Sequence, residues 1–310
     1  MDLSAINPAI LLASLMIAAT PILLAAIGEL VVEKAGVLNL GVEGMMVMGA
    51  VCGYAVAVNT GSPWVGFLGA AIGGALLSLV FGLLTQYLMT NQVATGLGLT
   101  LFGLGLSALI GTEYLQLRPP SGNALNLTFL GGLPVIGETL GRLDVIVVLS
   151  LVLVGCTWWF LKHSRAGLIL RAVGENHDAA HALGYKVVHV RMLAIAFGGA
   201  CAGIGGAYLS LMRVSQWTEG MTAGAGWIAL AIVVFASWKP VWILVGAYLF
   251  GGVTVLQLNL QAAGLAVPVE YLSMSPYLIT ILVLVVMSSG RGRAAMNAPA
   301  SLGRSFHASG

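Results

Sequence analysis

Long apolar runs dominate the chain and are separated by short segments that carry nearly all of the charged residues. A membrane-spanning helix needs about 20 mostly apolar residues, whereas a transmembrane β-strand is shorter and alternates between apolar and polar positions. The runs here are continuous and predict about nine helical spans, near residues 8–30, 41–58, 64–88, 93–112, 143–161, 191–212, 222–236, 241–260 and 274–289. Because the run at 222–236 is short for a full crossing, eight spans with one re-entrant segment are an alternative.

The amino-acid composition supports this prediction. Hydrophobic residues make up 59% of the chain and charged residues 8%, against about 45–50% and about 25% in ordinary globular proteins. So few charges cannot cover the surface of a soluble fold, which excludes a soluble enzyme, a disordered chain and a secreted disulfide scaffold. The net charge of +2 is too small to attract nucleic acid. We therefore predict an all-α, polytopic helical membrane protein with one transmembrane domain over residues 1–310.

The basic residues predict an orientation, because short cytoplasmic loops are enriched in Lys and Arg. Placing the connection at about 162–190 in the cytoplasm puts the N-terminus outside, and the C-terminus, with a tail at about 290–310, inside. The cytoplasmic basic residues are then Lys34, Lys162, Arg165, Arg171, Lys186, Arg191, Lys239, Arg291, Arg293 and Arg304, and those outside are Arg118, Arg142 and Arg213. The outer connection at about 113–142 is either a receptor-docking surface or a plain loop.

The sequence lacks the common catalytic motifs. None of its lysines follows a glycine, so it has no GxxxxGK[ST] phosphate-binding loop, and HExxH and GxSxG are also absent. Cys52, Cys156 and Cys201 are far apart and have no metal-ligand spacing. We predict that the chain is not an enzyme, holds no cofactor or metal of its own, and transports a solute.

One segment breaks the apolar pattern near the start of the second span. Gly36, Gly41 and Gly44 interrupt it, with Asn39 and Glu43 between them. A carboxylate inside the bilayer faces protein or water, and glycine-broken helices are tolerated where the backbone lines a cavity or is buried in protein. The segment is therefore interpreted as a kinked stretch that lines a substrate path. The alternative is that Glu43 lies near the cytoplasmic boundary and caps a helix N-terminus.

A second informative segment lies in the predicted cytoplasmic connection. Asn176 is a good N-cap and Gly184 a good residue to follow a helix, so a short helix is expected between them. Ala179 and Ala180 lie four and three residues before Leu183, on one predicted face. Because so short a helix is marginal in water, we expect it to form by docking on something. A plain solvated loop is the alternative.

These segments carry a resemblance to a known family. Asp178-Ala179-Ala180, followed by three residues and then Gly184, resembles the EAAxxxG loop of ABC importer permeases, with Asp in place of Glu. Residues 36–46 resemble the GVxNLGxEGMM signature of permeases that import nucleosides with a basic-membrane-lipoprotein type receptor. Phe235 to Pro240 resembles the F-G-x-W-x-P turn of that group, with Ala236 in place of Gly. Residues 298–303 resemble its APAALG ending.

The resemblance implies a type II ABC importer permease fold in the plasma (inner) membrane. It implies a cytoplasmic coupling helix that binds a separate ABC ATPase, which would hold the ATP and Mg²⁺. The corresponding positions are Glu175, Asn176, Asp178, Ala179, Ala180, Leu183 and Gly184. A second homologous permease, giving a heterodimer, and an extracytoplasmic substrate-binding lipoprotein are further implied partners. Permeases for sugars and branched-chain amino acids share the broader fold.

The predicted function is ATP-driven import of a nucleoside by alternating access. Amide and carboxylate groups and an aromatic face suit ribose hydroxyls and a flat base, and the candidate path residues are Asn39, Glu43, Asn91, Gln92 and Trp227. Buried structural polar groups are the competing interpretation. An ABC permease for simple sugars such as ribose or galactose, and an ion-coupled secondary transporter, are alternatives. Residues 41–76 loosely parallel 223–249, which indicates a possible inverted repeat around a midplane site.

Overall fold

A computed structural model describes residues 8–120, 143–262 and 298–307, together with positions 271, 274, 278, 281, 282 and 285, and within these residues all regular structure is helical. The α-helices are α1 (Pro8–Lys34), α2 (Val42–Thr60), α3 (Pro63–Gly82), α4 (Gln92–Gly111), α6 (Val145–His163), α7 (Arg165–Glu175), α8 (His177–Ala182), α9 (Val187–Ala207), α10 (Ala225–Phe235) and α11 (Pro240–Ala262). Short π-helical turns η2 (Leu83–Tyr87) and η5 (Tyr208–Arg213) extend α3 and α9, and a 3₁₀ turn η3 (Thr112–Tyr114) extends α4.

Seven described helices are long and apolar enough to cross a membrane. They correspond to seven of the nine predicted spans. The predicted run at 222–236 instead contains α10, an apolar helix of 11 residues, which is about 16 Å long and covers only half of a bilayer core. The chain leaves α9 at one end of the bundle, whereas Trp238, just before α11, bonds to Glu33 near the other end. Residues 214–239 therefore cross the bundle as a non-helical stretch followed by a half-length helix, and the alternative of a re-entrant segment is wrong. The remaining predicted span, 274–289, the tail before residue 298 and most of the outer connection lie outside the continuously described residues.

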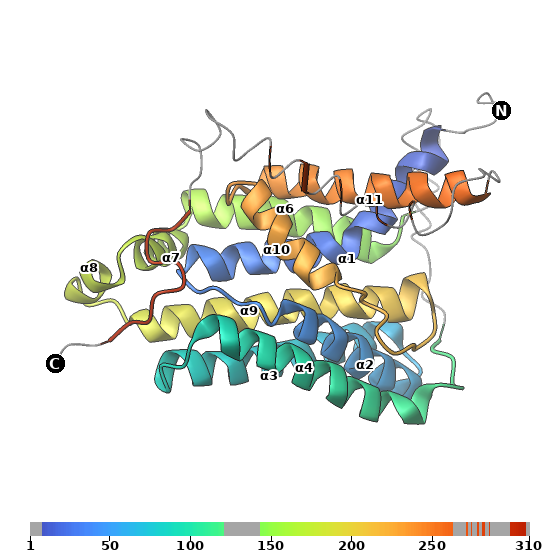
Figure 1. The fold of residues 1–310 in the computed structure, drawn as a ribbon, viewed down its shortest axis with the longest axis horizontal. Coiled ribbons are helices and arrows are strands. Elements are labelled where there is room, and N and C mark those ends of the chain that lie inside the picture. The colour runs from blue at the N-terminus through green and yellow to red at the C-terminus, as the bar shows by residue number, and fades with distance from the viewer. Residues whose placement is uncertain are drawn as a thin grey trace.

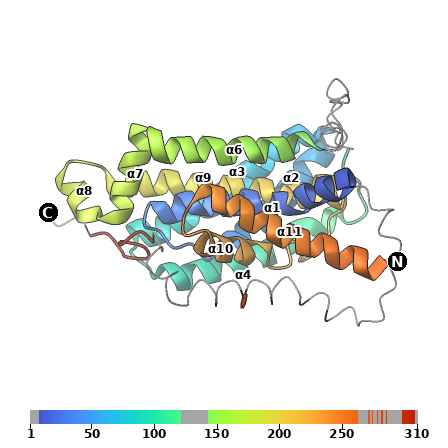
Figure 2. The same cartoon turned by 90° about the horizontal axis from the view of Figure 1, so that it is seen from above.

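The central pair of helices is α1 and α9, which lie side by side in both views (Figures 1 and 2). Helix α9 also packs on α2 and α3, and α4 covers α2, whereas α6 and α11 pack on α1. Helices α7 and α8 project from one end of this bundle (Figure 1), which we call the α8 end. The opposite end holds the α2–α3 turn and the start of α6, where Tyr208 donates a hydrogen bond to Asp144.

Glycines let α2, α3 and α9 approach at backbone distance. A Cβ atom on Gly49 would lie 2.1 Å from Cα of Gly203, and one on Gly206 would lie 1.8 Å from the carbonyl oxygen of Met46. A Cβ atom on Gly74 would lie 2.2 Å from the carbonyl oxygen of Gly199. Helices in lipid have no hydrophobic driving force to associate, so close packing of this kind stabilises their association.

The two halves of the described chain have the same order of elements but run through the bundle in opposite directions. In the first half a long helix, α1, is followed by a non-helical segment (35–41), then by α2, a tight turn and α3. In the second half α9 is followed by a non-helical segment (214–224), then by α10, a turn and α11. Pro63 and Pro240 begin the helix after each turn, where a missing N–H group costs nothing. Helix α1 ends at the α8 end and α9 begins there, so the two halves are inverted.

We predict that Gly206→Ala weakens the fold, because the new methyl group overlaps the backbone of α2. Overpacking of this kind costs about 1–3 kcal/mol. The matched control is Gly105→Ala, since a Cβ atom at this exposed position on α4 has nothing within 4 Å. Thermal unfolding of the detergent-solubilised protein measures both, and equal midpoints for the two variants would contradict the packing argument.

Candidate functional site

The first feature of the site is the sharp end of α1. The N–H of Val37 donates to the carbonyl of Val32 at 3.3 Å and the N–H of Gly36 to that of Glu33 at 2.8 Å. Gly36 has φ +84°, the left-handed conformation that glycine adopts without a Cβ penalty. These bonds form a Schellman motif. It ends the helix at the α8 end and turns the chain back into the bundle.

The chain that follows, residues 35–41, is non-helical and lies inside the bundle. We call it the broken segment. Buried side chains accept hydrogen bonds from its N–H groups: Oε1 of Gln92 from Leu38 at 2.8 Å, Oε1 of Glu29 from Asn39 at 3.3 Å, and Oδ1 of Asn39 from Gly41 at 2.9 Å. An unpaired backbone group costs several kcal/mol in an apolar environment. The polar residues of this segment therefore make an irregular backbone possible inside the membrane protein.

Helix α2 begins well inside the bundle rather than at its end. A Cβ atom on Gly96, in the second turn of α4, would lie 2.8 Å from the backbone nitrogen of Leu40. One on Gly44 would lie 2.8 Å from Cα of Thr100, and the hydroxyl of Thr100 donates to the carbonyl of Leu40 at 3.2 Å. The start of α2 is thus beside the second and third turns of α4, so Glu43 does not lie at the bundle boundary.

Glu43 joins the start of α2 to the start of α10. Its Oε1 accepts hydrogen bonds from the hydroxyl of Thr222 at 2.6 Å and the N–H of Gly224 at 2.9 Å, and its Oε2 accepts one from the N–H of Gly226 at 2.7 Å. The side chain is 3% exposed. The first N–H groups of a helix have no partner within it and carry partial positive charge. The carboxylate at the start of α2 therefore caps the half-length helix α10, and we call this contact the Glu43 junction.

The structure brings together three of the five predicted path residues. Asn39, Glu43 and Gln92 are buried around the broken segment, and Nε2 of Gln92 has no hydrogen-bond partner among the described residues. Asn91 is exposed and caps α4, where its side chain accepts from the N–H of Ala94 at 3.0 Å. Trp227 lies in the first turn of α10 with 48% of its surface exposed.

The partners of these residues were not predicted from the sequence. Glu29, Thr222, Gly224 and Gly226 all bond to the broken segment or to Glu43. Glycines 220, 224 and 226 before an apolar run signal a second helix that starts inside the bundle. Their pairing with Glu43 is a long-range contact that this signal does not contain.

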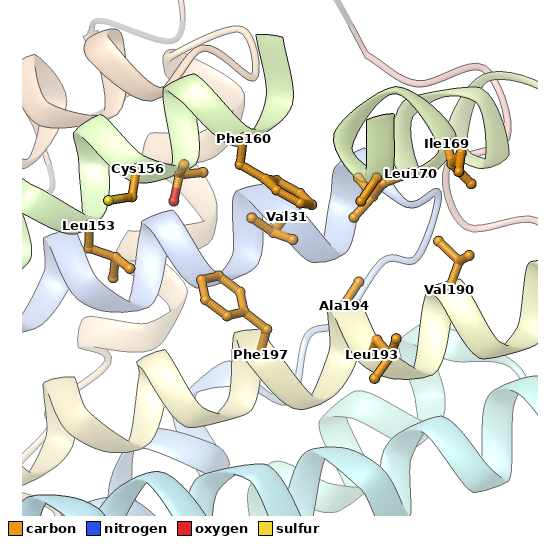
Figure 3. A pocket seen from close by; sticks show the side chains of 12 residues that line it. Val31, Leu153, Cys156, Phe160, Ile169, Leu170, Val190, Leu193, Ala194 and Phe197 are labelled. Carbon is orange, nitrogen blue, oxygen red and sulfur yellow. The ribbon is translucent and has the colours of Figure 1, made fainter. Parts of the chain in front are cut away.

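Two described cavities differ in the ligands they suit. A cavity of about 210 Å³ lies between α1, η5, α11 and the segment before α10, and its polar lining residues are Arg213, Thr222, Thr254 and Gln257. A cavity of about 390 Å³ lies between α1, α6, α7 and α9 (Figure 3), and its walls are almost entirely apolar, with Phe160 and Phe197 among them. A hydroxyl-rich solute would leave its polar groups unpaired there. Only the first cavity adjoins the Glu43 junction, through Thr222.

The short helix expected between Asn176 and Gly184 is α8. Oδ1 of Asn176 accepts from the N–H of Ala179 at 3.0 Å, and Gly184 follows the helix with φ +87°. The expectation of a single docking face formed by Ala179, Ala180 and Leu183 is wrong in part. Ala180 is buried against the bundle, whereas Ala179 is exposed and Leu183 is 76% exposed. The six-residue helix is therefore held by the protein on one side and presents Leu183 on the other.

Arg191 of α9 links α8 to the rest of the α8 end. It is fully buried, and its Nη2 lies 3.2 Å from Nδ1 of His177 in α8. Its Nε donates to the carbonyl of Ala35 at 3.2 Å, and its Nη1 donates to Oε1 of Gln86 at 3.3 Å and to the carbonyl of Arg304 at 3.1 Å. One guanidinium group thus contacts the end of α1, the η2 turn, α8 and the C-terminal segment.

The C-terminal segment 298–307 packs on the α8 end and contacts α7, α8 and the broken segment. The N–H of Ser301 donates to the carbonyl of Gly174 at 2.9 Å and that of Gly303 to the carbonyl of Gly36 at 3.1 Å. Phe306 is buried and makes edge-on ring contacts with His177 and His181, with ring centroids 5.5 and 5.2 Å apart. The motif-like ending of the sequence therefore clasps α8 to the broken segment.

The α10–α11 turn is attached to the end of α1. Nε1 of Trp238 donates to Oε2 of Glu33, and both side chains are buried. Ser237 and Trp238 have φ +48° and +56°, an uncommon conformation for residues with a side chain. The tryptophan of the predicted turn motif thus acts as an anchor between the two halves. Among the described residues, no cluster of three or more His, Cys, Asp or Glu residues could hold a metal ion.

Comparison with known proteins gives consistent relatives. A family described as branched-chain amino acid transport system permease components matches residues 11–287. A putative glucose ABC transporter permease protein of Haloferax volcanii is 45% identical over 254 residues, which cover 80% of this chain and 77% of the relative. A nucleoside ABC transporter permease protein of Lactococcus lactis is 30% identical and covers 89% and 92%. A guanosine ABC transporter permease protein of Bacillus subtilis is also 30% identical and covers 92% and 93%.

We predict that Arg191→Gln destabilises the α8 end, because it leaves the buried Ala35 carbonyl and the carbonyl of Arg304 without their charged donor. Loss of a hydrogen bond to a charged group costs about 1.5–3 kcal/mol. Arg165→Gln, at an exposed position of α7, is the control. Hydrogen exchange in residues 175–185 should become faster only in the first variant. Unchanged exchange would show that Arg191 does not hold α8.

A second prediction concerns pH. Burial lowers the pKa of His177; Arg191, Arg304 and His307 lower it further, and Asp178 opposes them. The attached state of α8 therefore favours neutral His177, so its stability is present above the ordinary pKa of histidine and is lost as the pH falls. Protection of α8 from hydrogen exchange, relative to the intrinsic exchange rate at each pH, should fall on acidification, and should fall less in His177→Gln. His189→Gln, at an exposed position, should behave like wild type; a loss of protection that is equal in all three proteins would refute the assignment.

Proposed function

Because this chain belongs to the family of branched-chain amino acid transport system permease components, we propose that it is the membrane subunit through which an ATP-driven importer passes a simple sugar or a nucleoside. The relatives named as sugar and nucleoside ABC permeases support the coarse class. The observation that carries the proposal is the Glu43 junction, where the half-length helix α10 and the longer helix α2 both start inside the bundle. Such broken helices commonly flank the solute sites of transporters.

The substrate class follows from the relatives and the polar groups available. The relative with 45% identity is named for glucose, so a simple sugar becomes the first candidate, ahead of the nucleoside predicted from the sequence. The two permeases named for nucleosides match more of the chain at lower identity, which keeps a nucleoside as the second candidate. Both solutes share a ring with several hydroxyl groups, which suits the amide, hydroxyl and guanidinium groups beside the junction.

The solute path is proposed to run from the 210 Å³ cavity past the Glu43 junction to the α8 end. Thr222 lines this cavity and donates a hydrogen bond to Glu43. Gln92, beside the broken segment, has a donor, Nε2, with no partner among the described residues. Movement of α2 against α10 would open the region between them. Asn39, Trp227 and Gln92 are then the groups that meet the solute, and Asn91 has a capping role.

Coupling to ATP hydrolysis is proposed to enter through α8. Leu183 and Ala179 face outward and suit the apolar groove of a partner ATPase, which would hold the ATP and Mg²⁺. Arg191 and residues 298–307 connect α8 to the end of α1 and the broken segment. A movement of α8 would therefore reach the end of α1 through these hydrogen bonds, and the Glu43 junction through the covalent chain of residues 35–43.

The remaining features of the proposal are orientation and assembly. The α8 end carries Lys34, Lys162, Arg165, Arg171, Lys186, Arg191, Lys239 and Arg304, and the opposite end carries Arg118 and Arg213. The positive-inside rule favours a cytoplasmic α8 end. A second homologous permease and an extracytoplasmic lipoprotein that delivers the solute would complete the importer.

We predict that Leu183→Asp abolishes ATP-dependent uptake and ATPase co-purification while leaving membrane insertion intact, because a charged group replaces the exposed apolar contact. Leu183→Met keeps the apolar surface and should retain both activities. Uptake should stop on ATP depletion and survive an ionophore. Uptake that stops with the ionophore but survives ATP depletion would favour an ion-coupled transporter and overturn the proposal.

A further prediction tests the junction. Glu43→Gln replaces one acceptor oxygen by an NH₂ group that faces the N–H groups of α10, so we expect transport to fall about tenfold or more. Glu219→Gln, at an exposed position, should leave transport unchanged. Uptake of labelled glucose with unlabelled nucleoside as competitor, and the reverse, identifies the substrate. Normal uptake in Glu43→Gln would show that the junction is dispensable for transport.

A further inference from the structure

Four basic residues converge on one cavity at the α8 end, on the opposite side of α6 from the apolar cavity of Figure 3. This cavity of about 870 Å³ is lined by Lys34, Lys162, Arg171 and Lys239, and Glu175 is its one acidic lining residue. The lining therefore carries a net charge of three positive units. Arg171 comes from α7, Lys239 from the α10–α11 turn and Lys34 from the end of α1.

The rest of the wall is built for the membrane–water boundary. Trp158 and Trp242 line the cavity with 41% and 53% of their surfaces exposed, beside exposed Leu168 and Val241. Nζ of Lys162 lies 5.2 Å from the ring centroid of Trp158, a cation–π contact that orients the ammonium group. Tryptophans at span ends lie at headgroup depth. The charges and the apolar rim thus lie at the depth where a phospholipid presents a phosphate above its acyl chains.

We propose that this cavity binds the phosphate headgroup of an acidic phospholipid. Basic pockets between spans on the cytoplasmic side are suited to anionic headgroups, and the orientation proposed above puts the α8 end on that side. An acidic surface of the ATPase is the competing occupant. The apolar rim of Trp158, Trp242, Leu168 and Val241 favours the lipid, since acyl chains need such a surface and an acidic protein surface does not. A bound lipid would bridge α6 and α7 to the α10–α11 turn, independently of which solute is transported.

The test is native mass spectrometry of the full-length protein in detergent, with phosphatidylglycerol and phosphatidylcholine of the same acyl chains. Wild type should retain phosphatidylglycerol preferentially. Arg171→Gln with Lys239→Gln removes two exposed charges and should weaken this binding about thirtyfold, since each basic group near an anionic surface contributes about fivefold. Arg165→Gln with Lys186→Gln removes two charges that do not line the cavity and should bind like wild type, as should the charge-preserving pair Arg171→Lys with Lys239→Arg.

Several results would overturn the proposal. Equal retention of the two lipids would show that the site does not select a negative charge, and unchanged binding by the Arg171→Gln/Lys239→Gln protein would place the lipid elsewhere. Inorganic phosphate that displaces the lipid at equal concentration would assign the cavity to a free anion. Loss of the ATPase from the assembled complex in the same variant, with lipid binding unaltered, would assign the cavity to the protein partner.

Discussion

The carboxylate of Glu43 permits the most unusual part of this fold, which is two helices that begin in the middle of a membrane bundle. The first N–H groups of a helix have no partner within it, and each one left unpaired in an apolar interior costs several kcal/mol. Glu43 accepts from the N–H groups of Gly224 and Gly226, and Gln92 and Glu29 accept from the segment before α2. Burying these polar side chains in a membrane protein costs free energy, but they pair backbone N–H groups that would otherwise be buried without a partner.

The same arrangement connects the middle of the bundle to its α8 end. The broken segment begins at Ala35, whose carbonyl accepts a hydrogen bond from Arg191. Glu43 lies only eight residues further along the chain. Hydrogen bonds link the α8 helix and the C-terminal segment to the chain that leads into α2. Glycine contacts hold α2 and α3 closely against α9.

Short-range features explain why much of this was predictable. The lengths of the apolar runs predicted seven of the long helices, and the shortness of 222–236 indicated the half-length α10. Asn176 and Gly184 marked the ends of α8 because a cap and a left-handed glycine act within one helical turn. The expected docking face on α8 was wrong for Ala180, which packs on Val173, Val187 and Phe306, contacts that its own helix does not reveal.

The chain pattern therefore specified the membrane class, the helices and the polar residues that interrupt them, since hydrophobic length, capping and backbone conformation are local properties. Tertiary structure decided which groups meet. Glu43 and Gly226 are 183 residues apart, and Arg191 and Ala35 are 156 apart. Each polar residue could have faced solute, lipid headgroup or backbone. Only the packing of the inverted halves brings a particular donor within reach of a particular acceptor, because hydrogen bonds act over about 3 Å.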